Sequence, residues 1–241
     1  MDKNNIFFGD RLSLWLKDGI STKLVKLNEN LECDVCVVGA GITGITTAYR
    51  LMESGLKVVL IDKSLPLNLA SGNTTAKFTF QHGLVYHKII ENYGLSTAKL
   101  FYSAQQEGLK YVRHLISKHN IECDFKETAA IVYAESEKDF EEIEKEVDAY
   151  KQLEIPYKIL TKFLNGIKIF GGLNVDNQLE LNPVKYLDSM LKVLLKNQVS
   201  VFKDTEATLV KKNDNFIEVT TKDNYKIKCQ KLVVATAYPF Y

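Results

Sequence analysis

The sequence predicts an α/β fold built on a parallel sheet, with a mixed α+β segment inserted into it. Three observations carry this expectation. A glycine-rich turn, Gly39 to Gly44, stands between a short apolar run and a helical pattern, and a second apolar run follows that pattern directly. A third apolar run, KLVVATA, lies near the end of the chain. Short valine-rich runs of this kind are typical of parallel strands that are buried on both faces.

The first part of the chain is expected to form a strand, a helix, a second strand and a loop. The run from Asp34 to Val38 predicts a buried strand, and apolar residues at three- and four-residue spacing predict a helix from Thr43 to Glu53. Gly55 is placed to end this helix, and the second strand is expected from Lys57 to Ile61. The stretch 63–81 is rich in Ser, Thr, Asn and Gly and has little period, which is typical of a functional or disordered loop.

The middle of the chain predicts helices beside a second, separate sheet. Two helical patterns over 84–119 are broken near Gly94, and the charged segment 138–153 predicts a third helix. Strand-like runs at 130–134 and 167–170 flank this third helix, so we expect a separate mixed sheet there.

The last third returns to the parallel sheet. Pro183 suits the first position of a helix that runs to Lys196. Short strands are expected around Val199, Thr208, Ile217 and Ile227, and a final buried strand in the segment from Lys231. The expected parallel sheet combines the runs at Val35, Val58, Val199 and Val233. The chain is expected to leave this first domain near Thr79 and to return near Asn182.

Composition and charge describe an ordinary globular protein. The 241 residues are 46% apolar, and 31 basic and 30 acidic side chains give a net charge of +1. This balance predicts neither a nucleic-acid partner nor an anionic membrane surface. The N-terminus lacks the pattern of a secretory signal and no run approaches a membrane span, so the sequence predicts a cytoplasmic protein.

Four cysteines, Cys33, Cys36, Cys123 and Cys229, are expected to be free thiols. The CxxC pair formed by Cys33 and Cys36 also admits a redox dithiol or half of a zinc site. Because the pair leads into the apolar run VCVVGAG, we favour a strand in which Cys36 packs in a core. No second CxxC or nearby histidine completes a ligand set, so no metal site is expected.

The chemistry of the chain centres on a GxGxxG motif formed by Gly39, Ala40, Gly41, Ile42, Thr43 and Gly44. Between a strand and a helix, this motif binds a dinucleotide: Gly39 permits the turn, Gly41 admits the pyrophosphate, and Gly44 lets the helix approach the strand. Asp62 ends the second strand, where a carboxylate accepts hydrogen bonds from ribose hydroxyls and disfavours a 2′-phosphate. The alternative is a glycine turn in an unrelated α/β protein, and the motif alone does not separate NAD from FAD.

Two segments carry a resemblance to a known family. CDVCVVGAGITGITTAYRLMESGLKVVLIDK and SGNTTAKFTFQHGLVY resemble the D-amino-acid oxidase-like FAD-dependent oxidoreductases, and within them the bacterial members with a C-terminal Rieske domain. The resemblance continues through CDFKETAAIVYAES, LNPVKYLDSML and VVATAYPFY, and covers the chain from about Trp15 onward. The C-x-H and C-x-x-H pairs of a Rieske cluster do not occur here.

The resemblance implies FAD as the cofactor, held by several segments. Its ADP half is expected on the glycine turn with Asp62 and Lys63, and its flavin half near the loop 71–77. The further residues implied are Ser71, Gly72, Thr74, Thr75, Ala207, Ala235 and Thr236. Ala237 departs from the glycine that the family often has there, so a close approach of the dinucleotide at this position is in doubt.

The resemblance also implies a Rossmann-like FAD/NAD(P)-binding parallel sheet with an inserted substrate domain. The expected organisation is an N-terminal arm over 1–30, an FAD-binding domain from 31–80 and 182–241, and a partial substrate domain over 81–181. The second half that completes this domain in the resembling enzymes has no counterpart in the sequence, so the fold is expected to be incomplete at its C-terminus.

The leading function is an FAD-dependent oxidoreductase that oxidises an amine or amino acid by hydride transfer to the flavin. Two alternatives stay open: a non-catalytic dinucleotide-binding fragment that lacks the C-terminal half, and an NAD-dependent enzyme. Expected partners are the small-molecule substrate and either a missing C-terminal half or a second copy of the chain. Lys77 and His82 are candidates for tuning the flavin or orienting substrate, but no catalytic residue is assigned.

Overall fold

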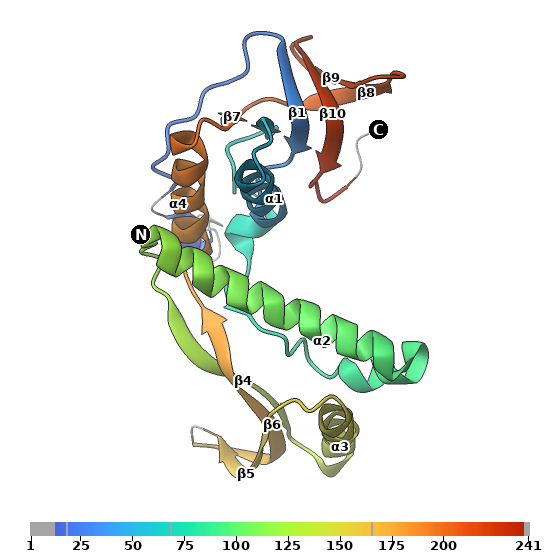
Figure 1. The fold of residues 1–241 in the computed structure, drawn as a ribbon. Coiled ribbons are helices and arrows are strands. Elements are labelled where there is room, and N and C mark those ends of the chain that lie inside the picture. The colour runs from blue at the N-terminus through green and yellow to red at the C-terminus, as the bar shows by residue number, and fades with distance from the viewer. Residues whose placement is uncertain (1–12, 18, 68, 165, 239–241) are drawn as a thin grey trace, which may run out of the picture. The chain divides into compact units, whose positions relative to one another are not determined.

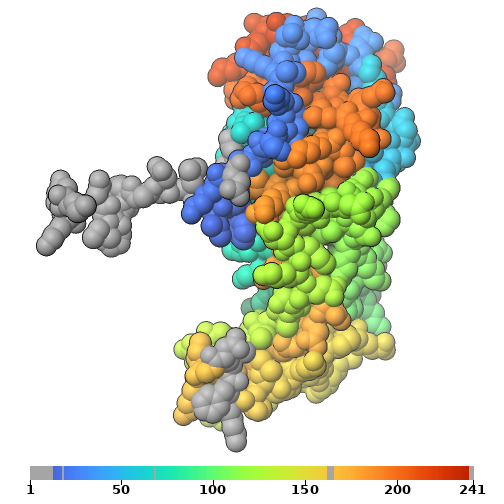
Figure 2. Space-filling model, turned by 90° about the vertical axis from the view of Figure 1, so that its left-hand side faces the viewer, coloured from blue at the N-terminus to red at the C-terminus, as the bar shows by residue number. Residues whose placement is uncertain are grey.

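The computed structural model describes residues 13–17, 19–67, 69–164 and 166–238 (Figure 1). The chain divides into two units, Met1–Thr75 with Asn182–Tyr241, and Ala76–Leu181. Figure 2 shows the two segments of the first unit, blue to cyan and orange to red, packed against each other. Expectations for the start of the N-terminal arm and for the last three residues lie outside the described residues. No described helix has the length and apolar character that crossing a membrane requires.

A six-stranded sheet forms the first unit, in the order β7-β2-β1-β10-β9-β8. Its strands are β1 (Leu31–Val38), β2 (Val58–Ile61), β7 (Ser200–Phe202), β8 (Ala207–Lys212), β9 (Ile217–Thr221) and β10 (Lys226–Val234). The first four strands in this order are parallel, and β9 and β8 continue the sheet in antiparallel pairs. The predicted parallel set is therefore confirmed. Helices α1 (Ile42–Glu53) and α4 (Pro183–Lys196) pack on each other and on this sheet.

One expectation for this sheet was wrong, because β10 is a single strand rather than two. Its first half alternates exposed and buried residues, with Ile227 and Cys229 in the core, while Leu232 to Val234 form a continuous apolar run. The change of pattern has a physical cause. Ile227 to Cys229 pair with β1 on one side and β9 on the other, whereas the residues from Lys231 on pair with β1 alone.

An irregularity in β1 sets which side chains share a face. The N–H groups of Asp34 and Val35 both donate to the carbonyl oxygen of Lys57, at 2.9 and 3.2 Å. In a regular strand, residues three apart lie on opposite faces of the sheet, but Cys33 and Cys36 pack in the same buried cluster. Cys36 is fully buried, which confirms the expectation of a core thiol, and all four cysteines are free and buried.

The second unit pairs a long helix and a shorter one with an antiparallel sheet. Helix α2 (Tyr86–His119) is kinked at Gly94, where φ is 83°, as the sequence predicts, and α3 spans Glu137–Gln152. The strands β3 (Lys77–Phe78), β4 (Lys126–Ala134) and β5 (Lys158–Leu164) all pair with β6 (Ile167–Glu180). These pairs are all antiparallel, so the mixed sheet that we expected does not form among the described residues.

Strand β6 runs ten residues beyond its expected end at Phe170, through two glycines that look like a turn in the sequence. The structure explains one of them by packing: a Cβ atom at Gly171 would overlap the ring of Phe140 on α3. Glycine therefore lets the helix lie close to the strand. Strand β5 was missed altogether.

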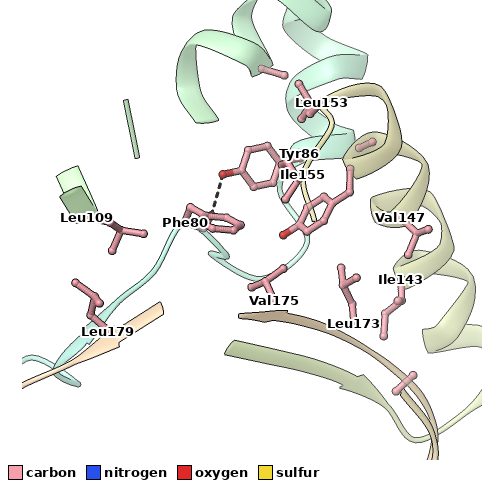
Figure 3. Packing of buried hydrophobic residues seen from close by; sticks show 14 residues of the cluster. Phe80, Tyr86, Leu109, Ile143, Val147, Leu153, Ile155, Leu173, Val175 and Leu179 are labelled. Atoms are coloured by element: carbon pink, nitrogen blue, oxygen red, sulfur yellow. Dashed lines mark hydrogen bonds between the residues drawn. The ribbon is translucent and has the colours of Figure 1, made fainter. Parts of the chain in front are cut away.

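The core of the second unit lies between α2, α3 and the sheet, and Figure 3 shows its side chains. Tyr86 is fully buried, and its hydroxyl donates to the carbonyl oxygen of Phe80 at 2.9 Å. Its ring meets that of Tyr150 edge to face, with centroids 5.5 Å apart. This arrangement suits aromatic rings that are packed without solvent.

A buried carboxylate closes the start of α2. No side chain within the cap itself bonds the first helical N–H groups. Instead Glu146 of α3, fully buried, accepts from the N–H groups of Val85, Tyr86 and His87 at 2.9 to 3.1 Å. It also bonds Nδ1 of His87 at 2.8 Å. A negative charge at the N-terminus of a helix is favourable, and the four contacts compensate its burial.

The described part of the N-terminal arm belongs to the first unit. Trp15 lies in a short 3-10 helix (Leu14–Leu16), and its Nε1 donates to the carbonyl oxygen of Thr74 at 2.9 Å. Further on, the hydroxyls of Ser21 and Thr22 donate to the carboxylate of Asp188 on α4, at 2.7 and 2.5 Å. The arm is therefore tied to the unit by hydrogen bonds at both places.

Asp188 should make the stability of the chain depend on pH. Burial acts to raise the pKa of Asp188, but hydrogen bonds from Thr22 and Ser21 outweigh it and lower the pKa to about 2. A carboxyl group whose pKa is lower in the folded state than in the unfolded state stabilises the fold when it is ionised. For Asp188 the stabilisation is complete above the unfolded pKa of about 4, and it is lost as the pH falls to about 2. We expect a loss of about 1 to 2 kcal/mol, reduced by solvent screening, over that window.

Urea unfolding at a series of pH values measures this effect, with Asp188→Asn as the matched variant. The variant should be less stable near neutral pH, and its stability should fall less between about pH 4 and 2. Equal slopes for both proteins over that window would contradict the prediction.

Candidate functional site

The glycine turn joins β1 to α1, and two of its glycines are required by the protein itself. Gly39 has a φ of +105°, and a Cβ atom there would lie 2.7 Å from the carbonyl oxygen of Ala235. A Cβ atom at Gly44 would overlap the carbonyl oxygen of Gly39. The first glycine thus makes the turn beside β10, and the last brings the helix against the turn.

Gly41 is different, because its missing side chain leaves room in a cavity. It is the N-cap of α1, and a Cβ atom there would meet only the Ser71 side chain, with Oγ at 2.7 Å. The first N–H groups of a helix have no acceptor within it, and together with the helix dipole they favour an anion. This combination fits the pyrophosphate of a dinucleotide.

The cavity at this turn lies within the first unit and has a volume of about 460 Å³, in the range of small-molecule sites. Eight of the predicted residues line it: Gly39, Gly41, Asp62, Lys63, Ser71, Ala207, Ala235 and Thr236. The other predicted residues do not line it: Ala40, Ile42, Thr43, Gly44, Gly72, Thr74 and Thr75. Lining residues that sequence reasoning missed are Val38, Ser64, Leu65, Leu67, Leu69, Ala70, Glu206 and Tyr238.

Asp62 holds the turn from the end of β2. Its Oδ2 accepts from the N–H of Ala40 at 2.7 Å, and its Oδ1 accepts from the N–H of Ser64 at 3.0 Å. A carboxylate oxygen can accept more than one hydrogen bond, so Asp62 can also accept hydrogen bonds from the hydroxyls of a ligand. The carboxylate therefore both orders the glycine turn and presents negative charge to the cavity.

Ser71 connects the long loop to the start of α1. It lies in a 3-10 helix (Ala70–Asn73), and its Oγ accepts from the N–H of Ile42 at 2.9 Å. A hydroxyl oxygen thus occupies the kind of position that a phosphate oxygen takes at a helix N-terminus. This hydrogen bond places the described part of the loop against the start of α1.

Gly72 and Thr74 have packing roles in the same loop. A Cβ atom at Gly72 would overlap the carbonyl oxygen of Leu67 and lie 2.8 Å from Cδ2 of Leu16. The carbonyl oxygen of Thr74 accepts from Trp15, as described above. Both residues thus anchor the loop to the N-terminal arm. The alternating leucines of the segment SLPLNLA were the sequence signal for the apolar cavity wall that we missed.

The far wall of the cavity comes from the last third of the chain. Ala207 begins β8, and Ala235 follows β10, where its N–H donates to the carbonyl oxygen of Val38 at 2.8 Å. Ala237 also lines the cavity, so its methyl group lies where the sequence raised a doubt about close approach. Glu206 adds a second carboxylate to this wall.

The remaining candidates lie in the second unit. Lys77 is on β3, and His82 is exposed, with Nε2 3.2 Å from Oε1 of Gln105. Neither residue lines the cavity of the first unit. Among the described residues, no group of three or more His, Cys, Asp or Glu side chains is arranged to hold a metal ion.

Comparison with known proteins gives relatives for most of the chain. It is 34% identical over 215 residues to the putative Rieske 2Fe-2S iron-sulfur protein YhfW of Bacillus subtilis, covering 89% of this chain and 42% of the relative. It is 36% identical over 100 residues to gamma-glutamylputrescine oxidoreductase of Escherichia coli, covering 42% of this chain and 24% of that one.

Among solved structures, L-amino acid deaminase from Proteus vulgaris has the same fold. It superposes with a TM-score of 0.70 at 19% identity, over 90% of this chain and 49% of that protein. The chain thus spans half or less of the length of these relatives.

A family model described as "DAO: FAD dependent oxidoreductase" matches residues 34–239, which include the glycine turn, Asp62, the Ser71 loop and the end of β10. FAD is the cofactor of this family, and the cavity at the start of α1, lined by Gly41 and the carboxylate of Asp62, fits its ADP portion. The chain belongs to the DAO family of FAD-dependent oxidoreductases.

Proposed function

We propose that the chain provides the FAD-binding part of an oxidoreductase that oxidises an amine or an amino acid. The observation that carries the proposal is the cavity at Gly41, where an open glycine, the N-terminus of α1 and the carboxylate of Asp62 meet. Bound FAD supplies the redox chemistry by accepting a hydride from the substrate. The residues of the chain bind and orient it.

Each wall of the cavity has a task in this proposal. The first turn of α1 receives the pyrophosphate, and the Ser71 hydroxyl contacts the same group from the loop. Asp62 accepts hydrogen bonds from ribose hydroxyls, and its charge disfavours a 2′-phosphate. The start of β8 at Ala207 meets the adenine through its backbone, and Ala235 and Thr236 close the site beside the turn.

The substrate class rests on the relatives. One of them is named a gamma-glutamylputrescine oxidoreductase, and the solved structure with the same fold is an L-amino acid deaminase. Both names describe proteins that act on a nitrogen-bearing substrate. We therefore propose an amine or amino acid as the substrate class.

An absorbance spectrum of the purified chain, alone and after addition of FAD followed by gel filtration, tests cofactor binding. Retained flavin bands support the proposal, and their loss on anaerobic addition of an amine or amino acid supports the oxidoreductase activity. Retained flavin that no amine or amino acid reduces favours the alternative of a non-catalytic dinucleotide-binding unit. A folded chain that retains no flavin contradicts both.

Replacing Asp62 with alanine should weaken FAD binding by about tenfold or more, equivalent to about 1.4 kcal/mol. The change removes both a ligand contact and the acceptor that orders the N–H of Ala40 in the turn. Titration of FAD with fluorescence detection measures the affinity. Asp214→Ala removes an exposed carboxylate outside the cavity and should leave the affinity unchanged.

A further inference from the structure

Three thiols of the first unit lie in one buried cluster of the six-stranded sheet. Cys33 and Cys36 come from β1 and Cys229 from β10, and all three pack with residues of β2 and β9. Cys33 and Cys36 share this cluster although they are three residues apart on β1. The dinucleotide site uses none of these side chains.

Strand register distinguishes the possible pairs of thiols. Cys33 and Cys229 are direct partners in the parallel pair β1–β10. Neighbouring strands lie about 4.8 Å apart, within the range of about 4.4 to 6.8 Å that separates the Cα atoms of disulfide-bonded cysteines. Cys36 is paired with Leu232, three residues farther along β10 than Cys229, so it is not the direct cross-strand partner of Cys229.

A second cavity reaches the pair from the surface. It has a volume of about 470 Å³ and is lined by Cys33 and Cys229 together with Lys57 and Lys228. The space is ample for a small oxidant. Glu32 and Asp34 also line this cavity, and Lys228 pairs with Glu32 at 3.3 Å, so its charges are nearly balanced.

The three thiols are not equivalent in acidity. The Cys36 thiol donates a hydrogen bond to the sulfur of Cys229, which lowers the pKa of Cys229 and raises that of Cys36. Burial raises the pKa of Cys33 to about 12. The lower pKa favours Cys229 over Cys33 as the attacking thiol, and its Sγ lies 3.6 Å from the carbonyl oxygen of Ile217, to which it donates when protonated.

We propose that Cys33 and Cys229 are a redox site that closes into a reversible disulfide when a peroxide enters this cavity. The Cys229 thiolate attacks one oxygen of hydrogen peroxide, the O–O bond breaks, and a sulfenic acid and hydroxide form. The Cys33 thiol then loses its proton and attacks the Cys229 sulfur, the S–O bond breaks, and water leaves. The two thiols give up two electrons and the peroxide accepts them.

The bond would link the two strands that lead to the dinucleotide cavity. β1 ends before Gly39 and β10 ends before Ala235, and both residues line that cavity. The disulfide would also close a loop that contains most of the chain, and long loops gain the largest stabilisation from a cross-link. Oxidation should therefore raise the urea concentration at the midpoint of unfolding, and a thiol reductant should reverse the shift.

The test is to treat the folded chain with hydrogen peroxide, block the remaining thiols, and map the peptides by mass spectrometry without reduction. We expect one cross-linked peptide pair, containing Cys33 and Cys229, with Cys36 and Cys123 recovered as blocked thiols. A disulfide that involves Cys36, or four thiols that all remain blocked and unlinked, overturns the proposal.

Variants separate the roles of the thiols. Cys33→Ser should leave Cys229 as a sulfenic acid that a cyclic dione reagent labels, whereas Cys229→Ser should give no labelling at either position. Cys36→Ala should form the same disulfide several-fold more slowly, because the hydrogen bond that favours the Cys229 thiolate is lost. Cys123→Ser, in the other unit, should change nothing, and circular dichroism confirms that each variant is folded.

Discussion

Replacing Gly41 with valine is expected to abolish FAD binding, with a loss of at least about 100-fold in affinity, or about 2.7 kcal/mol. The side chain would enter the cavity at the N-terminus of α1 and fill the space that the pyrophosphate needs. Because a Cβ atom there meets only the side chain of Ser71, the chain should still fold. FAD titration and circular dichroism measure the two properties separately.

Two glycine variants serve as controls for this experiment. Gly108→Val adds the same side chain on α2, where a Cβ atom meets nothing within 4 Å, and should bind FAD like the original chain. Gly44→Val should unfold the first unit, because its Cβ atom would overlap the carbonyl oxygen of Gly39. Unchanged FAD affinity in the folded Gly41→Val variant would refute the proposed position of the pyrophosphate.

Replacing Glu146 with alanine should destabilise the second unit by about 3 to 5 kcal/mol. The change leaves the N–H groups of Val85, Tyr86 and His87 without their buried acceptor at the start of α2. It also removes the partner of the His87 ring. Urea unfolding followed by circular dichroism measures the loss, which is a large fraction of the stability of an ordinary domain.

Glu142 provides the matched comparison, since it lies one turn earlier on the same helix and its side chain is 46% exposed. Glu142→Ala should leave the unfolding midpoint nearly unchanged, because its ion pair with Lys145 is solvated. The unfolding midpoint of Glu146→Gln should lie between those of Glu142→Ala and Glu146→Ala, since the amide oxygen of glutamine still accepts hydrogen bonds from backbone N–H groups. Equal stabilities for the Glu142 and Glu146 alanine variants would contradict the capping role.

The sequence was most informative where local chemistry leaves few options. The strand, glycine turn, helix and acid from Val35 to Asp62 predicted the parallel sheet and a dinucleotide site, because this order and spacing suit a dinucleotide. The family followed from the resemblance of longer segments. The proline at the start of α4 and the glycine that kinks α2 were also read correctly, since each restricts the backbone in a known way.

Local pattern failed where a neighbour in space decides the structure. β10 was divided in two because β9 pairs with only its first half, and β6 was cut short because Gly171 makes room for Phe140. Strand pairing and helix packing are long-range contacts, and neither leaves a local period that a single sequence reveals.

The sequence by itself predicted a dinucleotide site from the glycines and Asp62, and the resemblance added Lys63, Ser71, Ala207, Ala235 and Thr236, which line the same cavity. Only the tertiary structure decided that Gly72 and Thr74 anchor the loop, whereas Gly41 and Ser71 line the cavity. Only the tertiary structure likewise showed that Glu146 bonds the start of α2 and that Cys33 lies opposite Cys229. In each case the decisive partner is far away in the chain, and folding brings it within the few ångströms over which hydrogen bonds and packing act.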